Sequence, residues 1–175
     1  MILITGASRG LGKAIYDDLK SKGQEVIGLS RKKSSDSNLL ECDVSDYDSI
    51  KNCSIEVKKR TNKIYALINA AGMASMNITL ATPNSMTKKI IETNLLGAIY
   101  TNQIFGPMLI RNKKGRIINF STLAVKIGLE GEAVYVASKA GVEAFSRSLA
   151  RELSNFNITV NCIAPGPIRT DILRG

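Results

Sequence analysis

Histidine is absent from all 175 residues of the sequence. Its absence excludes Ser-His-Asp and Cys-His mechanisms and every metal site that needs a histidine ligand. Any acid–base chemistry must therefore use Tyr, Lys, Asp, Glu or Cys side chains.

Cysteine is scarce: Cys42, Cys53 and Cys162 are far apart and form no CxxC pair. An odd, scattered count is typical of a reducing cytosol and predicts neither a disulfide framework nor a zinc site. We expect no metal ion. The chain starts directly with strand-like residues, which leaves no room for a signal peptide, and no apolar run approaches the ~18 residues of a membrane helix. These features predict a cytoplasmic protein without a membrane anchor.

Acidic residues are outnumbered by basic ones, 15 against 24, which gives a net charge of +9. The basic residues are spread over RKKSS (31–35), KKR (58–60), KK (88–89) and RNKKGR (111–116), and no nucleic-acid motif accompanies them. We therefore expect no nucleic-acid partner. A basic nucleic-acid binder remains an alternative, which a steep salt dependence of binding would support.

Aromatic residues make up only 5% of the chain, whereas 44% of it is hydrophobic. This composition suits a helix-rich or α/β protein built from Ile, Leu, Val and Ala. At 175 residues the chain is long enough for one domain with a proper core. We therefore treat residues 1–175 as a single domain.

Apolar segments that resemble strands alternate with segments of helical spacing. Leu11, Ala14, Ile15 and Leu19 predict a helix that Gly23 ends. Ser45 with Asp48 resembles a capping box at the start of a second helix. Further helices are expected at 83–110 and 135–153, and strands at 1–5, 25–30, 39–42, 65–69, 116–120 and 158–163.

The alternation of strands and helices predicts an α/β fold, a doubly wound parallel sheet of about six strands. Ligands of such sheets bind beyond the carboxyl ends of the strands. The loops at 6–12, 69–72, 121–122 and 165–170 fall there. We expect the functional site at this edge of the sheet.

Glycines at 6, 10 and 12 form a TGxxxGxG turn between the first strand and the first helix. A P-loop is excluded because Ala14 follows Gly12-Lys13 where a Ser or Thr is needed, and because residue 7 is alanine instead of glycine. The turn still suits a pyrophosphate, since it exposes backbone N–H groups at a helix N-terminus.

Six motifs, in order along the chain, resemble those of the short-chain dehydrogenase/reductase family. They are TGASRGLG (5–12), NAAG (69–72), Asn94 in ETNLLGA, GRIINFST (115–122), YVASK (135–139) and NCIAPGPIRTD (161–171). The resemblance covers essentially the whole chain, and the run from Tyr135 to Asp171 looks most like 3-oxoacyl-[acyl-carrier-protein] reductases. It implies a Rossmann fold and an oxidoreductase that transfers a hydride between a nicotinamide and a carbonyl or secondary alcohol.

The resemblance assigns the catalytic roles to Tyr135, Lys139, Asn94 and Thr122. Tyr135 and Lys139 stand four residues apart and share one helix face. A nearby ammonium lowers the tyrosine pKa from its usual ~10, so Tyr135 is expected to exchange the proton. Asn94 would organise a water relay to the lysine. Thr122 occupies the position of the family's substrate-orienting serine and keeps the hydroxyl, with Ser121 in reserve.

The cofactor is expected to be NADP(H) rather than NAD(H). The second strand ends in Leu29-Ser30-Arg31-Lys32, without the acidic residue that NAD-specific folds usually carry. Arg31, together with Arg9 in the glycine turn, suits a 2′-phosphate.

The resemblance also implies contacts along the rest of the cofactor. Asp43 and Val44 would contact the adenine, Asn69 and Gly72 would support the ribose, and Ile168 with Thr170 would hold the carboxamide. The expected cofactor-binding residues are Gly6, Ser8, Arg9, Gly10, Leu11, Gly12, Ser30, Arg31, Asp43, Val44, Asn69, Ala70, Gly72, Tyr135, Lys139, Pro165, Gly166, Ile168 and Thr170.

Besides a small carbonyl or alcohol substrate, the expected partner is a second copy of the chain. In the family, the helices at about 85–110 and 135–153 meet those of a symmetry mate. The second helix carries small residues at helical spacing, namely Ala137, Ala140, Gly141, Ala144 and Ser148. We expect a homodimer or homotetramer through these helices.

Two features depart from the family pattern. Only eight residues (31–38) separate the second and third strands, so the helix usually found there is expected to be vestigial or absent. Family members also continue into a substrate-binding helix pair, another helix and a seventh strand, so the chain looks truncated after its Pro-Gly motif.

A missing seventh strand would leave strand 158–163 at an open edge with neither charge nor proline to protect it. Residues 1–175 alone are then expected to be aggregation-prone and nearly inactive. A truncated or catalytically disabled dinucleotide-binding module that acts through association is therefore the alternative function.

Overall fold

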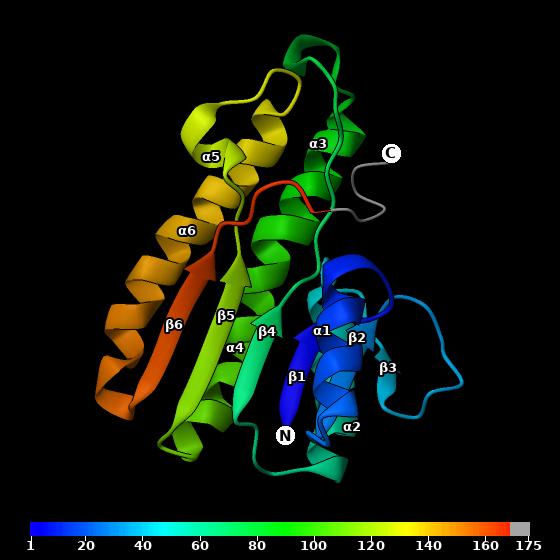
Figure 1. The fold of residues 1–175 in the computed structure, drawn as a ribbon, viewed down its shortest axis with the longest axis vertical. Coiled ribbons are helices and arrows are strands. Elements are labelled where there is room, and N and C mark those ends of the chain that lie inside the picture. Colours follow the sequence, from blue (N-terminus) through cyan, green and yellow to red (C-terminus); the bar gives the residue numbers. More distant parts are fainter. Residues whose placement is uncertain (169–175) are drawn as a thin grey trace.

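The computed structural model describes residues 1–168, which contain a six-stranded parallel sheet in the order β3-β2-β1-β4-β5-β6 (Figure 1). The strands are β1 (Ile2–Thr5), β2 (Val26–Ser30), β3 (Leu39–Glu41), β4 (Ala66–Asn69), β5 (Gly115–Phe120) and β6 (Ile158–Ile163). This is the strand order of a doubly wound dinucleotide-binding sheet, so the predicted fold class is confirmed. Each predicted strand boundary lies within one residue of the observed one.

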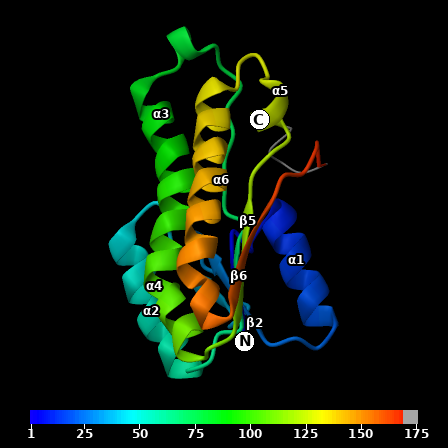
Figure 2. The ribbon, with the colours of Figure 1, turned by 90° about the vertical axis from the view of Figure 1, so that its left-hand side faces the viewer.

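The helices lie on both faces of the sheet. They are α1 (Gly10–Ser21), α2 (Tyr47–Arg60), α3 (Asn84–Ile91), α4 (Gly97–Arg111), α5 (Ala124–Ile127) and α6 (Ala133–Leu153). Figure 2 shows α2, α4 and α6 along one face and α1 along the other. None of the helices within residues 1–168 has the length and apolar character needed to cross a bilayer.

The extent of the predicted helix at 83–110 is confirmed, since residues 84–111 are helical throughout, but the helix is wrong as one continuous α-helix. A π-helical turn, Glu92–Leu96, separates α3 from α4. Such turns occur frequently at functional sites, because the wider turn changes which side chains face inward. Here the turn buries Asn94, which is only 2% exposed.

The predicted capping box at Ser45 is also wrong. The Asp46 side chain caps α2 by accepting hydrogen bonds from the N–H groups of Asp48 and Ser49. The Ser45 hydroxyl donates instead to Asp43 Oδ1, at 2.7 Å. The Ser45 hydroxyl is therefore bonded to Asp43 and does not cap the helix as the sequence pattern predicts.

The connection between β2 and β3, residues 31–38, contains no helix, as its length predicts. It consists of turns and bends, and residues 31–35 are all exposed. Its far end joins the sheet through a hydrogen bond from Gly28 N to Asn38 O, at 2.8 Å.

Two apolar clusters hold the layers together. The larger one, which includes Leu3, Phe105 and Ile117, joins the sheet to α2 and α4. The smaller one, which includes Ile4, Tyr16 and Ile68, joins the sheet to α1. These clusters fix the strands, and the strands carry the loops of the site at their carboxyl ends.

The pairing register of β1, β4, β5 and β6 aligns the carboxyl ends of these four strands. Thr5 of β1 pairs with Asn69 of β4, Asn69 with Asn119 of β5, and Asn119 with Cys162 of β6. The segments that follow these residues therefore leave the sheet along a common edge, as the sequence predicts.

Candidate active site

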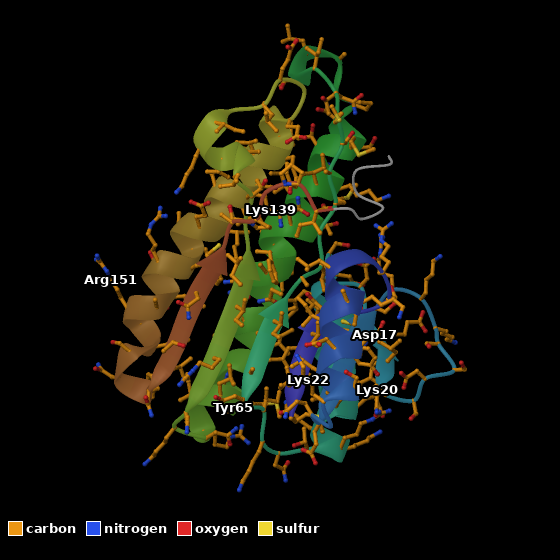
Figure 3. The ribbon with its side chains drawn as sticks, viewed as in Figure 1. Asp17, Lys20, Lys22, Tyr65, Lys139 and Arg151 are labelled. Carbon is orange, nitrogen blue, oxygen red and sulfur yellow. The ribbon has the colours of Figure 1, made fainter. Side chains whose placement is uncertain are left out.

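Helix α6 presents Tyr135 and Lys139 at the carboxyl edge of the sheet. The helix starts at Ala133, so both residues lie in its first two turns. Lys139 Nζ lies 6.0 Å from the centre of the Tyr135 ring. Figure 3 shows Lys139 near the ends of β5 and β6, whereas Arg151, further along the same helix, points outward.

Lys139 is buried, with only 7% of its surface exposed. Its ammonium donates a hydrogen bond to the carbonyl of Phe120 at the end of β5, at 2.9 Å. Burial lowers the pKa of Lys139 to about 8, because a charged amine is disfavoured away from water. The group can therefore exchange a proton near neutral pH.

Asn94 connects the π turn to the loop that follows β4. Its Oδ1 accepts a hydrogen bond from Met73 N, and its Nδ2 donates to Met73 O, both at 2.8 Å. Nδ2 also donates to Ser138 Oγ at 3.0 Å, and Ser138 donates to the carbonyl of Tyr135 at 2.6 Å. The amide thereby joins the 72–73 loop to the first turns of α6.

Gly72 lies between Asn94 and Lys139. A Cβ atom added to Gly72 would lie 3.4 Å from both Asn94 Oδ1 and Lys139 Nζ. A glycine therefore leaves both polar atoms open to the space beside them. This proximity is compatible with a water relay between the amide and the lysine.

The two neighbouring hydroxyls, Ser121 and Thr122, have different surroundings. Ser121 is only 3% exposed, and its Oγ donates to Glu143 Oε1 at 2.6 Å. Thr122 is half-buried, and its Oγ1 accepts a hydrogen bond from Ala124 N at 3.2 Å. Burial raises the pKa of Tyr135, and the neighbouring Thr122 side chain partly offsets this rise. In the structure burial thus outweighs the lowering of this pKa that the sequence predicts. Thr122 therefore faces the tyrosine, while Ser121 faces Glu143.

The glycine turn has close backbone packing on its inner side. Gly6 has a φ of +69°, and a Cβ on it would lie 2.8 Å from Ala71 Cα. A Cβ on Gly12 would lie 2.4 Å from Gly6 O. Neither position admits a side chain, so both glycines are required by the tight turn.

The N-terminus of α1 is open to an anion. Its N-cap residue, Arg9, makes no side-chain capping hydrogen bond, and the first turn contains no acidic residue. The free N–H groups of a first turn and the helix dipole both favour a negatively charged ligand. Ser8 and Arg9 beside this turn are exposed, as a binding role requires. These residues fit the pyrophosphate that the sequence predicts.

The adenosine end of the expected site lies at the ends of β2 and β3. Ser30 is buried, and its hydroxyl accepts a hydrogen bond from Lys32 N at 3.1 Å, which leaves Arg31 exposed at the turn. Asp43 is half-buried, with Oδ1 accepting the N–H of Ser45. Val44 is buried against the position of Gly97, where a Cβ would lie 3.0 Å from its side chain.

The Asn69 side chain points into the protein. It donates to Asn119 Oδ1 and accepts from the Thr101 hydroxyl, both at 2.8 Å. Asn119 donates in turn to Ser146 on α6. Because the Asn69 amide both donates and accepts within this buried chain of polar groups, we expect a cofactor contact by Asn69 to use its backbone.

The last described segment, residues 164–168, runs beside the end of β5. The carbonyl of Pro165 accepts a hydrogen bond from Leu123 N at 3.0 Å, next to Thr122. A Cβ on Gly166 would lie 3.5 Å from Leu123. Ala70 is half-buried and Ile168 is exposed. Thr170, expected to hold the carboxamide, lies outside the described residues.

Sequence reasoning missed three residues of this site. Ser138 links Asn94 to Tyr135, Glu143 holds Ser121, and Met73 supplies both backbone bonds to Asn94. Ser138 lies within YVASK, and Glu143 is one helical turn beyond Lys139. These spacings are the only signals in the sequence for Ser138 and Glu143.

Within residues 1–168 no cluster of three or more Cys, Asp or Glu residues is arranged to hold a metal ion.

Comparison with known proteins supports the motif resemblance. A family model described as short chain dehydrogenase matches residues 1–175. The chain is 35% identical over 175 residues to 3-oxoacyl-[acyl-carrier-protein] reductase MabA of Mycobacterium tuberculosis, covering 99% of this chain and 71% of that protein. It is 35% identical over 184 residues to 3-oxoacyl-[acyl-carrier-protein] reductase FabG of Staphylococcus aureus, covering 97% of this chain and 75% of that protein.

Solved structures agree with the fold. The ligand-free aldohexose dehydrogenase of Thermoplasma acidophilum has a TM-score of 0.92 and 29% identity, covering 99% of this chain and 68% of that one. A short-chain dehydrogenase of Streptomyces avermitilis has a TM-score of 0.89 and 27% identity, covering 97% of this chain and 66% of that one.

Proposed function

Because this chain belongs to the short-chain dehydrogenase family, and is thus an oxidoreductase that acts on CH–OH or C=O groups with NAD(P), we propose that it is an NADPH-dependent carbonyl reductase. Tyr135 is its general acid, Lys139 and Asn94 support the proton transfer, and Thr122 orients the substrate. The observation that carries this proposal is the convergence of Tyr135, Lys139 and the Asn94–Ser138 contact at the carboxyl edge of the sheet.

The environment of Tyr135 suits a proton donor. Burial raises the pKa of the phenol, so the group is protonated at neutral pH. The Lys139 ammonium near its ring favours the phenolate that remains once the proton has left. The phenol donates to the carbonyl oxygen as the oxygen becomes negative, and in the reverse direction the phenolate accepts the proton of the alcohol.

Thr122 and Asn94 prepare the geometry of this transfer. The Thr122 hydroxyl faces Tyr135, so the two groups can bind one substrate oxygen together. Asn94 holds Met73 by two hydrogen bonds to its backbone and thereby fixes the neighbouring Gly72 beside Lys139. Water held between Asn94 and Lys139 would return a proton to Tyr135.

The open N-terminus of α1 and the exposed Arg9 and Arg31 support NADP(H) as the cofactor. When bound, NADPH supplies the hydride for the carbonyl carbon. Arg9 and Arg31 would bind the 2′-phosphate by charge-assisted hydrogen bonds, which are roughly twice as strong as neutral ones. Asp43 and Val44 would contact the adenine.

A 3-oxoacyl thioester is the first substrate to test, because two relatives are named as 3-oxoacyl-[acyl-carrier-protein] reductases. NADPH consumption with acetoacetyl thioester, compared with NADH at equal concentrations, tests both parts of the proposal. We expect turnover with NADPH well above that with NADH. No turnover with either cofactor, on this and a panel of simple ketones and sugars, would contradict the proposed reductase.

A second candidate, a dinucleotide-binding module that acts by association, is favoured by one observation. The apolar side chains of Ile118, Phe120 and Ile163 line a cavity of about 410 Å³ on the α1 side of the sheet, and Ile163 is 46% exposed. A binding surface is a common reason for exposed apolar area. Cofactor binding without turnover would favour this candidate over the reductase.

We propose a two-fold dimer through α4 and α6. On α6, Ala137, Ala144 and Ser148 are exposed, whereas Gly141 packs inward, where a Cβ would lie 3.0 Å from Leu95. The small-residue stripe is therefore split between an inner and an outer face. The outer face allows two helices to approach closely.

The dimer is tested by Ala144→Trp, which adds bulk on the exposed face without entering the core. Light scattering should report a dimer for the unmodified protein and a monomer for the variant. The matched control is Ser21→Trp, which adds the same side chain at the exposed last position of α1, on the opposite face of the sheet, and should leave the dimer intact. A monomeric unmodified protein at high micromolar concentration would contradict the dimer.

The cysteines support a proposed cytoplasmic location. All three are free, and the Cys42 and Cys53 thiols lie together in the core, where the neighbouring thiol and burial raise the pKa of Cys42. Two adjacent unlinked thiols are typical of a reducing compartment.

A further inference from the structure

The loop between β2 and β3 carries a concentration of positive charge. Arg31, Lys32 and Lys33 are consecutive and exposed, and they follow directly after β2. The eight-residue connection has no helix, and its internal hydrogen bonds are local ones, such as Asp36 N to Ser34 Oγ at 3.1 Å. Arg60 of α2 also donates to the carbonyl of Ser37, at 2.5 Å. Contacts with the rest of the protein must therefore determine where these cations lie.

Asp36 provides such a contact. Its Oδ2 accepts hydrogen bonds from Tyr16 Oη at 2.8 Å and from Lys20 Nζ at 2.7 Å, both on α1. Its Oδ1 accepts the N–H of Asn38 at 3.0 Å. These bonds lower the pKa of Asp36 to about 2, so the carboxylate is charged at neutral pH. One side chain thus ties the loop to α1. Figure 3 shows Lys20 on α1, on the side of the molecule that carries β3.

Tyr16 holds this contact between Asp36 and α1, which we call the Asp36 tie, in a fixed position. Its side chain is only 2% exposed and belongs to the smaller apolar cluster. Gly28 of β2 leaves room for it, since a Cβ there would lie 3.2 Å from the Tyr16 ring and 2.3 Å from Leu39. The phenol ring is therefore packed between α1 and the sheet, and its hydroxyl has a fixed position for Asp36.

The tie borders a cavity that reaches the glycine turn. The cavity has a volume of about 390 Å³, and its lining includes Ser8 of the turn, Lys13 of α1, and Lys32, Lys33, Ser34 and Asp36 of the loop. Asp17 and Asp36 also line this cavity, and Asp17 pairs with Lys13. Lys32 and Lys33, with the hydroxyls of Ser8 and Ser34, are the remaining cationic and hydroxyl groups beside the proposed 2′-phosphate contacts, Arg9 and Arg31. This is the chemistry that recognises a phosphate monoester.

We propose that Asp36 is a positioning residue which, through Tyr16 and Lys20, holds the 31–38 loop against α1 and so sets the preference for NADPH over NADH. The proposal rests on the proposed use of NADP(H). Asp36 itself touches no phosphate. It acts by keeping the cations of the loop where a 2′-phosphate would lie.

A positioning role for Asp36 and simple electrostatics predict opposite changes in NADPH affinity when the Asp36 carboxylate is removed. Removing a carboxylate makes the cavity more positive, which by Coulomb attraction alone would strengthen NADPH binding. Loss of the tie would instead release the loop and weaken NADPH binding. Asp17 provides the matched control, because its carboxylate lines the same cavity but bonds to Lys13 on its own helix.

The test is the affinity of the purified protein for NADPH and for NADH, measured by cofactor fluorescence for four forms of the chain. Asp36→Ala should weaken NADPH binding about tenfold, the effect of one charge-assisted hydrogen bond, and leave NADH binding within about twofold. Tyr16→Phe, which removes only a hydroxyl, should weaken NADPH binding about threefold. Asp17→Ala should leave NADPH binding unchanged or stronger.

Trypsin cleavage supplies a second measurement that does not depend on the cofactor. Cleavage after Arg31, Lys32 or Lys33 should be faster in Asp36→Ala and Tyr16→Phe than in the unmodified protein, and unchanged in Asp17→Ala.

NADPH binding by Asp36→Ala that equals or exceeds that of the unmodified protein, or unchanged trypsin cleavage, would overturn the positioning role. If the unmodified protein bound neither cofactor, the proposed function would fail and the specificity role with it. The trypsin result would then still decide whether Asp36 ties the loop.

Discussion

The two faces of the sheet differ in what they bury. On one face, α2, α4 and α6 cover the strands, and the polar groups beneath them form a connected set that includes Asn69, Asn119 and Ser146. On the other face, α1 is the one helix that runs along the strands within residues 1–168. There Ile118 and Phe120 stay half-buried and Ile163 is 46% exposed.

This difference shows where the molecule can hold a reacting group in place. Lys139, Asn94 and Ser138 are all buried at the edge of the covered face, and each makes hydrogen bonds within it. Buried polar groups held by hydrogen bonds have few alternative positions, so they can keep the short distances that proton transfer needs. The opposite face over β4 to β6 presents apolar side chains, which can bind but cannot exchange protons.

The largest effect is expected at Lys139. Lys139→Met should reduce turnover by ~10²–10⁴-fold, because the ammonium that favours the Tyr135 phenolate is lost. In the unmodified protein, kcat/KM for reduction should fall as the pH rises through about 8, since Lys139 loses its proton there. A pH profile of kcat/KM checks both statements, and a profile that is flat from pH 6 to about 9 would argue against a catalytic ammonium.

The next prediction compares the stability lost when an isoleucine is truncated on each face of the sheet, at two neighbouring strands. Ile117 is fully buried on the covered face, and Ile163 is half exposed on the other. Ile117→Ala should lower the free energy of unfolding by ~2–5 kcal/mol. Ile163→Ala should lower it by less than about 1 kcal/mol. Urea unfolding measures both, and equal losses would mean that the two faces are equally well packed around these residues.

Local patterns were sufficient for the strands, since alternation of apolar segments and turn residues marks them directly. The Asp46 cap could not be predicted, because Asp43 removes the Ser45 hydroxyl through a loop geometry that the capping pattern does not contain. The π turn at Asn94 has the same helical periodicity as its flanks, so the sequence predicted one uninterrupted helix.

The candidate site was predictable where residues follow one another in a motif, as Tyr135 and Lys139 do. The choice between Ser121 and Thr122 depends on Glu143, which tertiary packing brings to Ser121 across 22 positions. The tie between Tyr16 and Asp36 spans 20 positions and leaves no local signal. Contacts of this kind depend on the packed fold, and a single sequence does not reveal them.

A smaller effect separates the two hydroxyls at the end of β5. Thr122→Ala should reduce turnover about tenfold, because it removes a hydrogen bond to the substrate oxygen beside Tyr135. Ser121→Ala should reduce it by no more than about threefold, since Ser121 bonds to Glu143 within the covered face. Steady-state turnover of both variants gives the ranking, and the reverse order would transfer the orienting role to Ser121.

We infer that Tyr135, at the edge of the covered face, is the proton donor, and that groups other than its hydroxyl supply most of the affinity for the cofactor. Tyr135→Phe removes the hydroxyl and keeps the ring, so NADPH affinity and turnover measured on the same preparation separate the two roles. For Tyr135→Phe we predict NADPH affinity within about threefold of that of the unmodified protein and turnover lower by ~10²–10⁴-fold. Turnover within about tenfold of the unmodified protein, with the cofactor bound, would contradict it.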